Sequence, residues 1–124
     1  SWLGRHGPFV DDPGPACQAY RELGARELIR RLLAGTVGAG FHEPVAAVGR
    51  FLDAMLDPVP EGGGLHVAVS HDLIIAGLLG VLLGEPLSDE QWPGFLEGPE
   101  LEALPGRRVR IRYRGQTYEV DRPA

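Results

Sequence analysis

Apolar positions recur with helical spacing in two segments of the first half of the chain. Between residues 16 and 34 they alternate with Arg and Glu, and Gly35 follows as a stop, which predicts an amphipathic helix over residues 16–34. Residues 36–40 are rich in small residues and predict a loop. A second helix is expected from Pro44, where a first-turn proline is tolerated beside the acidic Glu43, to the region of Leu56.

The pattern changes after the three consecutive glycines at 62–64. Residues 65–70 form a short β-branched run, which predicts a buried strand. Residues 73–83 are apolar almost all round, which indicates a helix covered on most sides. Ser88 and Gln91 make a capping box for a short helical turn that Pro93 ends.

The last segment alternates with a period of two. Val109, Ile111 and Tyr113 share one face, and arginines occupy the other. A turn at Arg114 and Gly115, followed by a return strand over residues 116–120, predicts a C-terminal β-hairpin. We therefore expect one α/β domain over residues 1–124, with helices flanking a largely parallel sheet that is centred on residues 65–70.

Composition and charge exclude several classes of partner. The chain has 124 residues, 18 Gly, 11 Pro and a net charge of −5, with arginine as its sole basic residue. A net negative charge argues against binding to nucleic acid, and the arginines at 107–114 are interpreted as a solvent-facing strand face that protects a sheet edge. The single Cys17 suits a reducing compartment. With neither a membrane-spanning run nor a signal peptide, we expect a cytoplasmic protein without membrane contact.

The candidate chemistry lies at the Ser70-His71-Asp72 step, where a predicted strand meets a predicted helix. Ligands of open α/β sheets bind at that edge, and a helix N-terminus offers unpaired N–H groups to an anion. An anion there would favour the protonated form of the Asp72 carboxyl, which is the form that protonates a leaving oxygen. The residues alone therefore suggest cleavage of a phosphate ester, with Asp72 as proton donor.

Other interpretations of the same step stay open or are weaker. Ser70 or Asp72 can simply cap the helix while His71 is a satisfied core histidine. A nucleophilic triad is excluded, because adjacent side chains diverge and cannot relay a proton in line. A metal site needs further ligands, and the best candidate, His42, has no second ligand at metal spacing beside it. No metal or cofactor is expected.

A resemblance strengthens the phosphate interpretation. The segment HVAVSHDLIIAGLLGVLLG, followed by QWPGFLEG, resembles the C-terminal half of the histidine phosphatase superfamily. The resemblance implies the phosphoglycerate-mutase-like fold, a three-layer sandwich with a largely parallel sheet. The resemblance extends back through GPFV, AGTVGAGFHEP and AVGRFLDAML. It implies a metal-independent phosphatase in which one histidine takes up the phosphoryl group and arginines hold the phosphate. His71 would then complete the pocket and Asp72 would be the acid.

The family's phosphoacceptor motif has one counterpart, Arg5-His6-Gly7, in which His6 would be the nucleophile and Arg5 a phosphate ligand. Few residues precede it, so it cannot end a buried first strand, and Pro8 follows where the family has a polar residue. The family's later phosphate-binding arginine has no counterpart before His71. We therefore interpret this motif as a chance match, and the chain as a domain incomplete at its N-terminus.

Two hypotheses follow. One is hydrolysis of a small phosphomonoester, or phosphoryl transfer, through a phosphohistidine. The other is a non-catalytic fragment or pseudo-enzyme that only binds an anion near His71. A thin sheet would leave an edge of residues 65–70 unpaired, so self-association through that edge is a further expectation.

Overall fold

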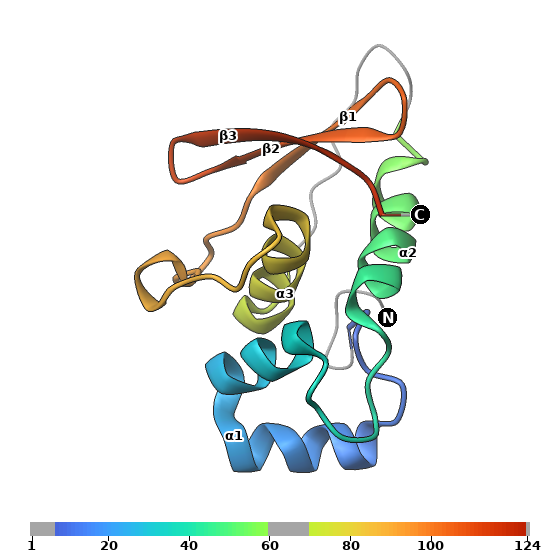
Figure 1. Ribbon diagram of the computed structural model, residues 1–124. Helices are drawn as coiled ribbons and strands as arrows, with labels where there is room; N and C mark the ends of the chain where they lie inside the picture. The colour runs from blue at the N-terminus through green and yellow to red at the C-terminus, as the bar shows by residue number, and fades with distance from the viewer. Residues whose placement is uncertain (1–6, 60–69, 124) are drawn as a thin grey trace.

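The computed structural model describes residues 7–59 and 70–123 and places three helices and a small sheet around one core (Figure 1). The elements are α1 (Pro13–Ala34), α2 (Pro44–Leu56), α3 (Asp72–Leu83), a 3₁₀ turn (Asp89–Gln91), β1 (Glu100–Leu104), β2 (Arg108–Tyr113) and β3 (Gln116–Asp121). None of the helices in these ranges is long and apolar enough to span a membrane.

Helix α1 is interrupted rather than continuous. Asp12 caps it by accepting a hydrogen bond from the Gly14 N–H at 3.1 Å, so it begins three residues before the predicted start. Gly24 has φ 76° and ψ 169° inside the helix, a conformation that glycine adopts without a Cβ penalty. The helix therefore changes direction at Gly24 (Figure 1) and ends at Gly35, whose φ is 75°.

Helices α2 and α3 start and end close to the predicted positions. Both carboxylate oxygens of Glu43 accept hydrogen bonds from the first turn of α2, from Val45 N at 3.0 Å and Ala46 N at 2.7 Å. The predicted capping box of Ser88 and Gln91 is also present. Helix α3 contacts both α1 and α2, and seven of its twelve residues are buried, which confirms the expectation of a helix covered on most sides.

The sheet corrects the predicted fold class. In the ranges that the structure describes it has three strands, ordered β1-β2-β3, and both pairings are antiparallel. A largely parallel three-layer sandwich is therefore wrong, although the mixed α and β content and the C-terminal hairpin agree with the prediction. Parallel strands need crossover connections of a dozen or more residues, whereas two or three residues link these strands.

The strand predicted at 65–70 cannot be compared directly with the structure. Residues 65–69, together with the expected unpaired edge, lie outside the described residues, and Ser70 is in no strand. The sequence prediction also overlooked β1, which makes β2 the central strand. The arginines of β2 therefore do not protect an edge, contrary to the interpretation above.

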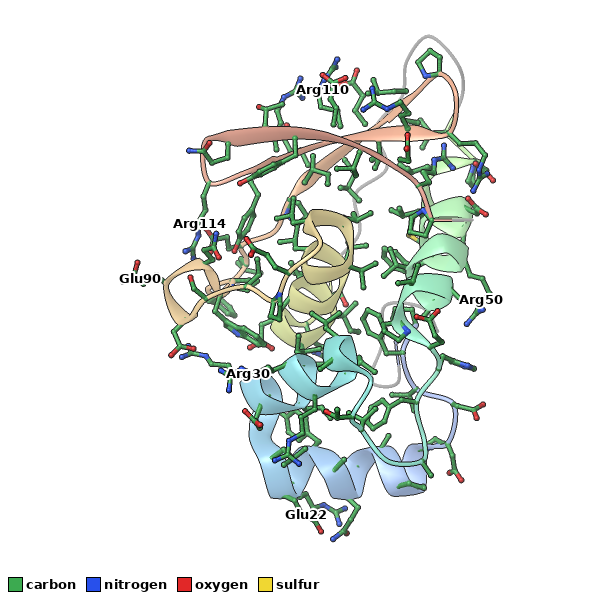
Figure 2. All side chains as sticks on the ribbon, viewed as in Figure 1. Glu22, Arg30, Arg50, Glu90, Arg110 and Arg114 are labelled. Carbon is green, nitrogen blue, oxygen red and sulfur yellow. The ribbon has the colours of Figure 1, made fainter. Side chains whose placement is uncertain are left out.

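The core lies between the sheet and the three helices (Figure 1). Val109 and Ile111 on the inner face of β2 are fully buried, and they pack in one cluster with Leu52 of α2, Leu79 of α3 and Ile29 of α1. The outer face of β2 is ionic. Arg110 pairs with Glu102 at 2.7 Å and with Glu119 at 3.6 Å, on the side of the sheet away from the helices (Figure 2).

Candidate functional site

His71 and Asp72 stand at the beginning of α3, as the sequence predicted. His71 is the N-cap, with an extended backbone (φ −93°, ψ 155°), and its side chain makes no capping hydrogen bond. Asp72 is the first helical residue, and both side chains are exposed. His71 and Asp72 therefore stand at the N-terminus of α3, where the helix dipole places its positive end.

The Asp72 carboxylate is fixed by two hydrogen bonds. Its Oδ1 accepts from the Leu73 N–H at 2.9 Å, and its Oδ2 accepts from the indole Nε1 of Trp92 at 2.8 Å. Each carboxylate oxygen can accept a second hydrogen bond, so the group can still bind a proton or a ligand. Trp92, in the segment QWPGFLEG at residues 91–98, therefore orients the candidate acid, a role that sequence reasoning did not assign.

The Trp92 segment is itself held by Arg114 from the β2–β3 turn (Figure 2). This guanidinium donates to the carbonyl oxygens of Glu90 and Trp92, and it pairs with the Glu97 carboxylate through Nε at 2.8 Å. The hydrogen bonds from Arg114 and from the Gly94 N–H lower the pKa of Glu97 to about 2. The hairpin thus connects the sheet with the position of Asp72.

Helix α1 also contacts the Trp92 segment. The guanidinium of Arg26 lies 5.6 Å from the centroid of the Trp92 ring and 3.3 Å from Asp89 Oδ1. A cation over an aromatic face is attracted by the ring quadrupole, although exposed pairs of this kind are weak. Trp92, whose indole donates to Asp72, is consequently held at two points: Arg114 binds its backbone carbonyl, and Arg26 of α1 lies at its ring.

A pocket of about 340 Å³ adjoins His71 and Asp72. Its walls come from the segment before α1, from α1, from Phe41 and from the first turn of α3. The lining includes the α1 residues Cys17, Tyr20 and Arg21. The sequence did not identify these three as site residues. A helical pattern shows which positions share a face, but it does not show which neighbouring element that face contacts.

Arg21 differs from most arginines of the chain. Within the ranges 7–59 and 70–123 only Arg21 and Arg50 form no ion pair or side-chain hydrogen bond. Arg50 points outward from α2 (Figure 2), whereas Arg21 lines the pocket beside His71. A positive charge, an imidazole and a helix N-terminus are therefore brought to one pocket.

The remaining candidates are not brought to this site, or cannot be placed. Arg5 and His6 lie outside the described residues. His42 Nε2 lies 3.9 Å from Asp11 Oδ1, and no group of three or more His, Cys, Asp or Glu able to hold a metal ion occurs among residues 7–59 and 70–123. The Arg108, Arg110 and Arg112 side chains pair with carboxylates of β1 and β3.

No known protein family, curated protein or solved structure matches this chain. The resemblance to histidine phosphatases therefore stays a prediction that rests on the residues quoted for it.

Proposed function

We propose that this chain binds a phosphate monoester at the N-terminus of α3 and hydrolyses it, or transfers its phosphoryl group, through a phosphohistidine. The observation that carries the proposal is the meeting of His71, Asp72 and Arg21 at one pocket. Arg21 and the first-turn N–H groups supply positive potential for the phosphoryl oxygens. His71 donates a further hydrogen bond to the same oxygens.

The reaction has two steps. An imidazole nitrogen attacks phosphorus, the ester P–O bond breaks, and Asp72 gives its proton to the departing alcohol oxygen. Water then attacks the phosphohistidine, the P–N bond breaks, and the Asp72 carboxylate takes up the proton of the water. The sequence offers one counterpart of the phosphoacceptor, His6, although its motif was interpreted above as a chance match, so the phosphohistidine test below decides this assignment.

A specific observation favours the second candidate function, anion binding without catalysis. Both oxygens of Asp72 accept hydrogen bonds, one of them from the backbone of its own helix, as a purely structural carboxylate would. In that case His71, Arg21 and the helix N-terminus would hold an anion, and no proton would move.

The test compares two substrates in three variants. Asp72→Asn removes the acid and should slow the hydrolysis of an alkyl ester, butyl phosphate, by about 10²–10⁴-fold, because an alkoxide must then leave unprotonated. It should largely spare nitrophenyl phosphate, whose leaving group needs little protonation. His71→Ala should slow both substrates, because it removes a donor to the phosphoryl group itself.

Trp92→Phe is the matched control for Asp72→Asn. It removes the indole hydrogen bond that orients Asp72 but keeps the acid, so its losses should be smaller than those of Asp72→Asn and again larger for the alkyl ester than for nitrophenyl phosphate. Equal losses on both substrates in Asp72→Asn would remove Asp72 from the acid role. Wild-type protein without turnover and without an acid-labile phosphohistidine would rule out the catalytic proposal, and the anion-binding alternative would then be tested by titration with inorganic phosphate.

A further inference from the structure

The pocket beside His71 separates into two chemically different parts. Tyr20, Arg21, His71 and Asp72 are exposed and form its mouth, together with the first turn of α3. Its deeper lining is apolar and buried, and comprises Phe9, Ala16, Leu28, Ile29, Leu32 and Ile74. Such a cavity fits a ligand with an anionic head and an apolar body.

We infer that the substrate is a phosphomonoester of an apolar alcohol or phenol, whose hydrocarbon part enters this pocket while its phosphate stays at the mouth. The inference rests on the proposed function and adds the class of leaving group. A polyhydroxylated alcohol such as a sugar would lose its water hydrogen bonds against this lining, where the half-buried Cys17 thiol is a weak replacement.

The size of the pocket agrees with this class of ligand. A dry apolar cavity of about 150 Å³ is sufficient to bind benzene, whereas this pocket measures about 340 Å³. It is therefore large enough for a fused pair of rings or a short branched chain. It also reaches the range of roughly 300–1,000 Å³ that is usual for small-molecule sites.

Charge complementarity orients the ligand. Arg21 has no carboxylate partner among the described residues, so its charge is available to a phosphate. Asp72 is the opposing group, since its carboxylate repels an anion unless it is protonated. The anionic head is therefore expected nearer Arg21 and His71, with Asp72 placed toward the ester oxygen.

Binding of phosphonates tests this inference without turnover, because their C–P bond is not cleaved. In calorimetric titrations, 1-naphthylmethylphosphonate should bind at least about tenfold more tightly than methylphosphonate, from the buried hydrocarbon area alone. Cys17→Met narrows the pocket at a half-buried position and should remove most of this preference. Its loss of affinity should be larger for the naphthyl compound than for methylphosphonate, and the thermal midpoint verifies that the variant is folded.

Arg21→Gln should weaken both phosphonates, whereas Arg50→Gln, the matched control on the outer side of α2, should change neither. Equal affinity for the two phosphonates, or no binding of either, would overturn the inference. Preferential binding of the naphthyl compound by a protein that shows no phosphatase turnover would support the pocket assignment and overturn the proposed catalysis. The two failures are thus distinguishable.

Discussion

The Glu97 carboxylate shows how single side chains set the position of a site they do not contact. Arg114 and the Gly94 N–H hold it in the charged form, and they lower its pKa from 4.5 to about 2. The same guanidinium donates to the Trp92 carbonyl at 2.9 Å, and the Trp92 indole donates to Asp72. Protonation of Glu97 would therefore loosen the segment that orients the candidate acid.

The sign of the pH dependence follows from the lowered pKa of Glu97. A carboxyl whose pKa is lower in the folded state stabilises the fold above its unfolded pKa, and this contribution is lost as the pH falls from about 4.5 toward 2. Glu97→Gln should therefore lower the thermal midpoint at pH 7 and flatten its decline between pH 4.5 and 2. Thermal unfolding across this pH range is the measurement.

Glu85→Gln is the control, since Glu85 is exposed and its side chain has no partner among the described residues. Its profile should run parallel to that of wild type. If the Glu97→Gln profile also runs parallel to wild type, the Arg114 pairing contributes nothing to acid stability.

The sequence placed single residues correctly where their position depends only on neighbouring residues in the chain. His71 and Asp72 could be placed because an N-cap and a first helical turn depend on a few adjacent residues. Arg21 and Trp92 could not be assigned to the site, because Arg21 reaches the pocket only through the fold and Trp92 contacts Asp72 across 20 residues of sequence. The fold alone brings the Trp92 indole to Asp72.

At the scale of elements, α3 depends on two small residues that allow close packing. A Cβ atom on Gly77 would lie 2.6 Å from Cε2 of Phe9, whose ring is buried, and 2.8 Å from its Cζ. A Cβ on Gly80 would lie 2.5 Å from Cδ1 of Leu33, the far end of a flexible and only partly buried side chain. The two glycines therefore meet neighbours of different mobility.

These neighbours predict different costs for the same substitution. Gly→Ala in a helix gains roughly 1 kcal/mol of propensity at either position, while overpacking costs about 1–3 kcal/mol where the neighbour cannot move. Gly77→Ala should therefore destabilise the protein by up to about 2 kcal/mol, whereas Gly80→Ala should be neutral or stabilise it by up to about 1 kcal/mol, because the Leu33 side chain can move. Urea unfolding of the two variants measures the difference, and equal effects would contradict a rigid Phe9 ring.

The elements themselves were predictable to different degrees. Helices depend on local periodicity, so α2 and α3 agree with their patterns to within a residue or two. The break in α1 at Gly24 and the strand β1 escaped notice, because a single glycine and a charged five-residue run carry weak signals. Pairing direction was wrong because the strand run at 65–70 was taken as the centre of the sheet, whereas Val109 and Ile111 of β2 are the fully buried strand residues.

On the scale of the whole molecule, Arg122 joins the end of the sheet to α2. Its side chain is only 8% exposed, and Nη1 lies 3.3 Å from Asp53 Oδ1 and 2.9 Å from Asp57 Oδ1. Its Nε is buried and has no hydrogen-bond partner among the described residues. A second arginine, Arg107, also reaches Asp53 Oδ1, at 3.0 Å.

Burial of the Arg122 guanidinium is a cost that its two ion pairs only partly offset. Both acceptors are substantially exposed, so water screens the pairs and can solvate the carboxylates when the arginine is absent. Asp53 would keep Arg107 as a partner. The side chain of Arg122, by contrast, is only 8% exposed, so its hydrocarbon stem is packed against neighbouring atoms and contributes through burial.

Two substitutions of Arg122 should therefore differ in their effect on the free energy of unfolding. Arg122→Met keeps most of the stem volume and removes the buried polar atoms, so stability should change by less than about 1 kcal/mol. Arg122→Ala should cost about 1–2 kcal/mol more, because it leaves a gap between the sheet and α2. Urea unfolding at low and at high salt measures the free energy of unfolding of both variants. Because both lack the ion pairs with Asp53 and Asp57, the stability of each should depend less on salt than that of wild type. If methionine and alanine destabilise the protein equally, the ion pairs with Asp53 and Asp57, and not the packing of the stem, attach the sheet to α2.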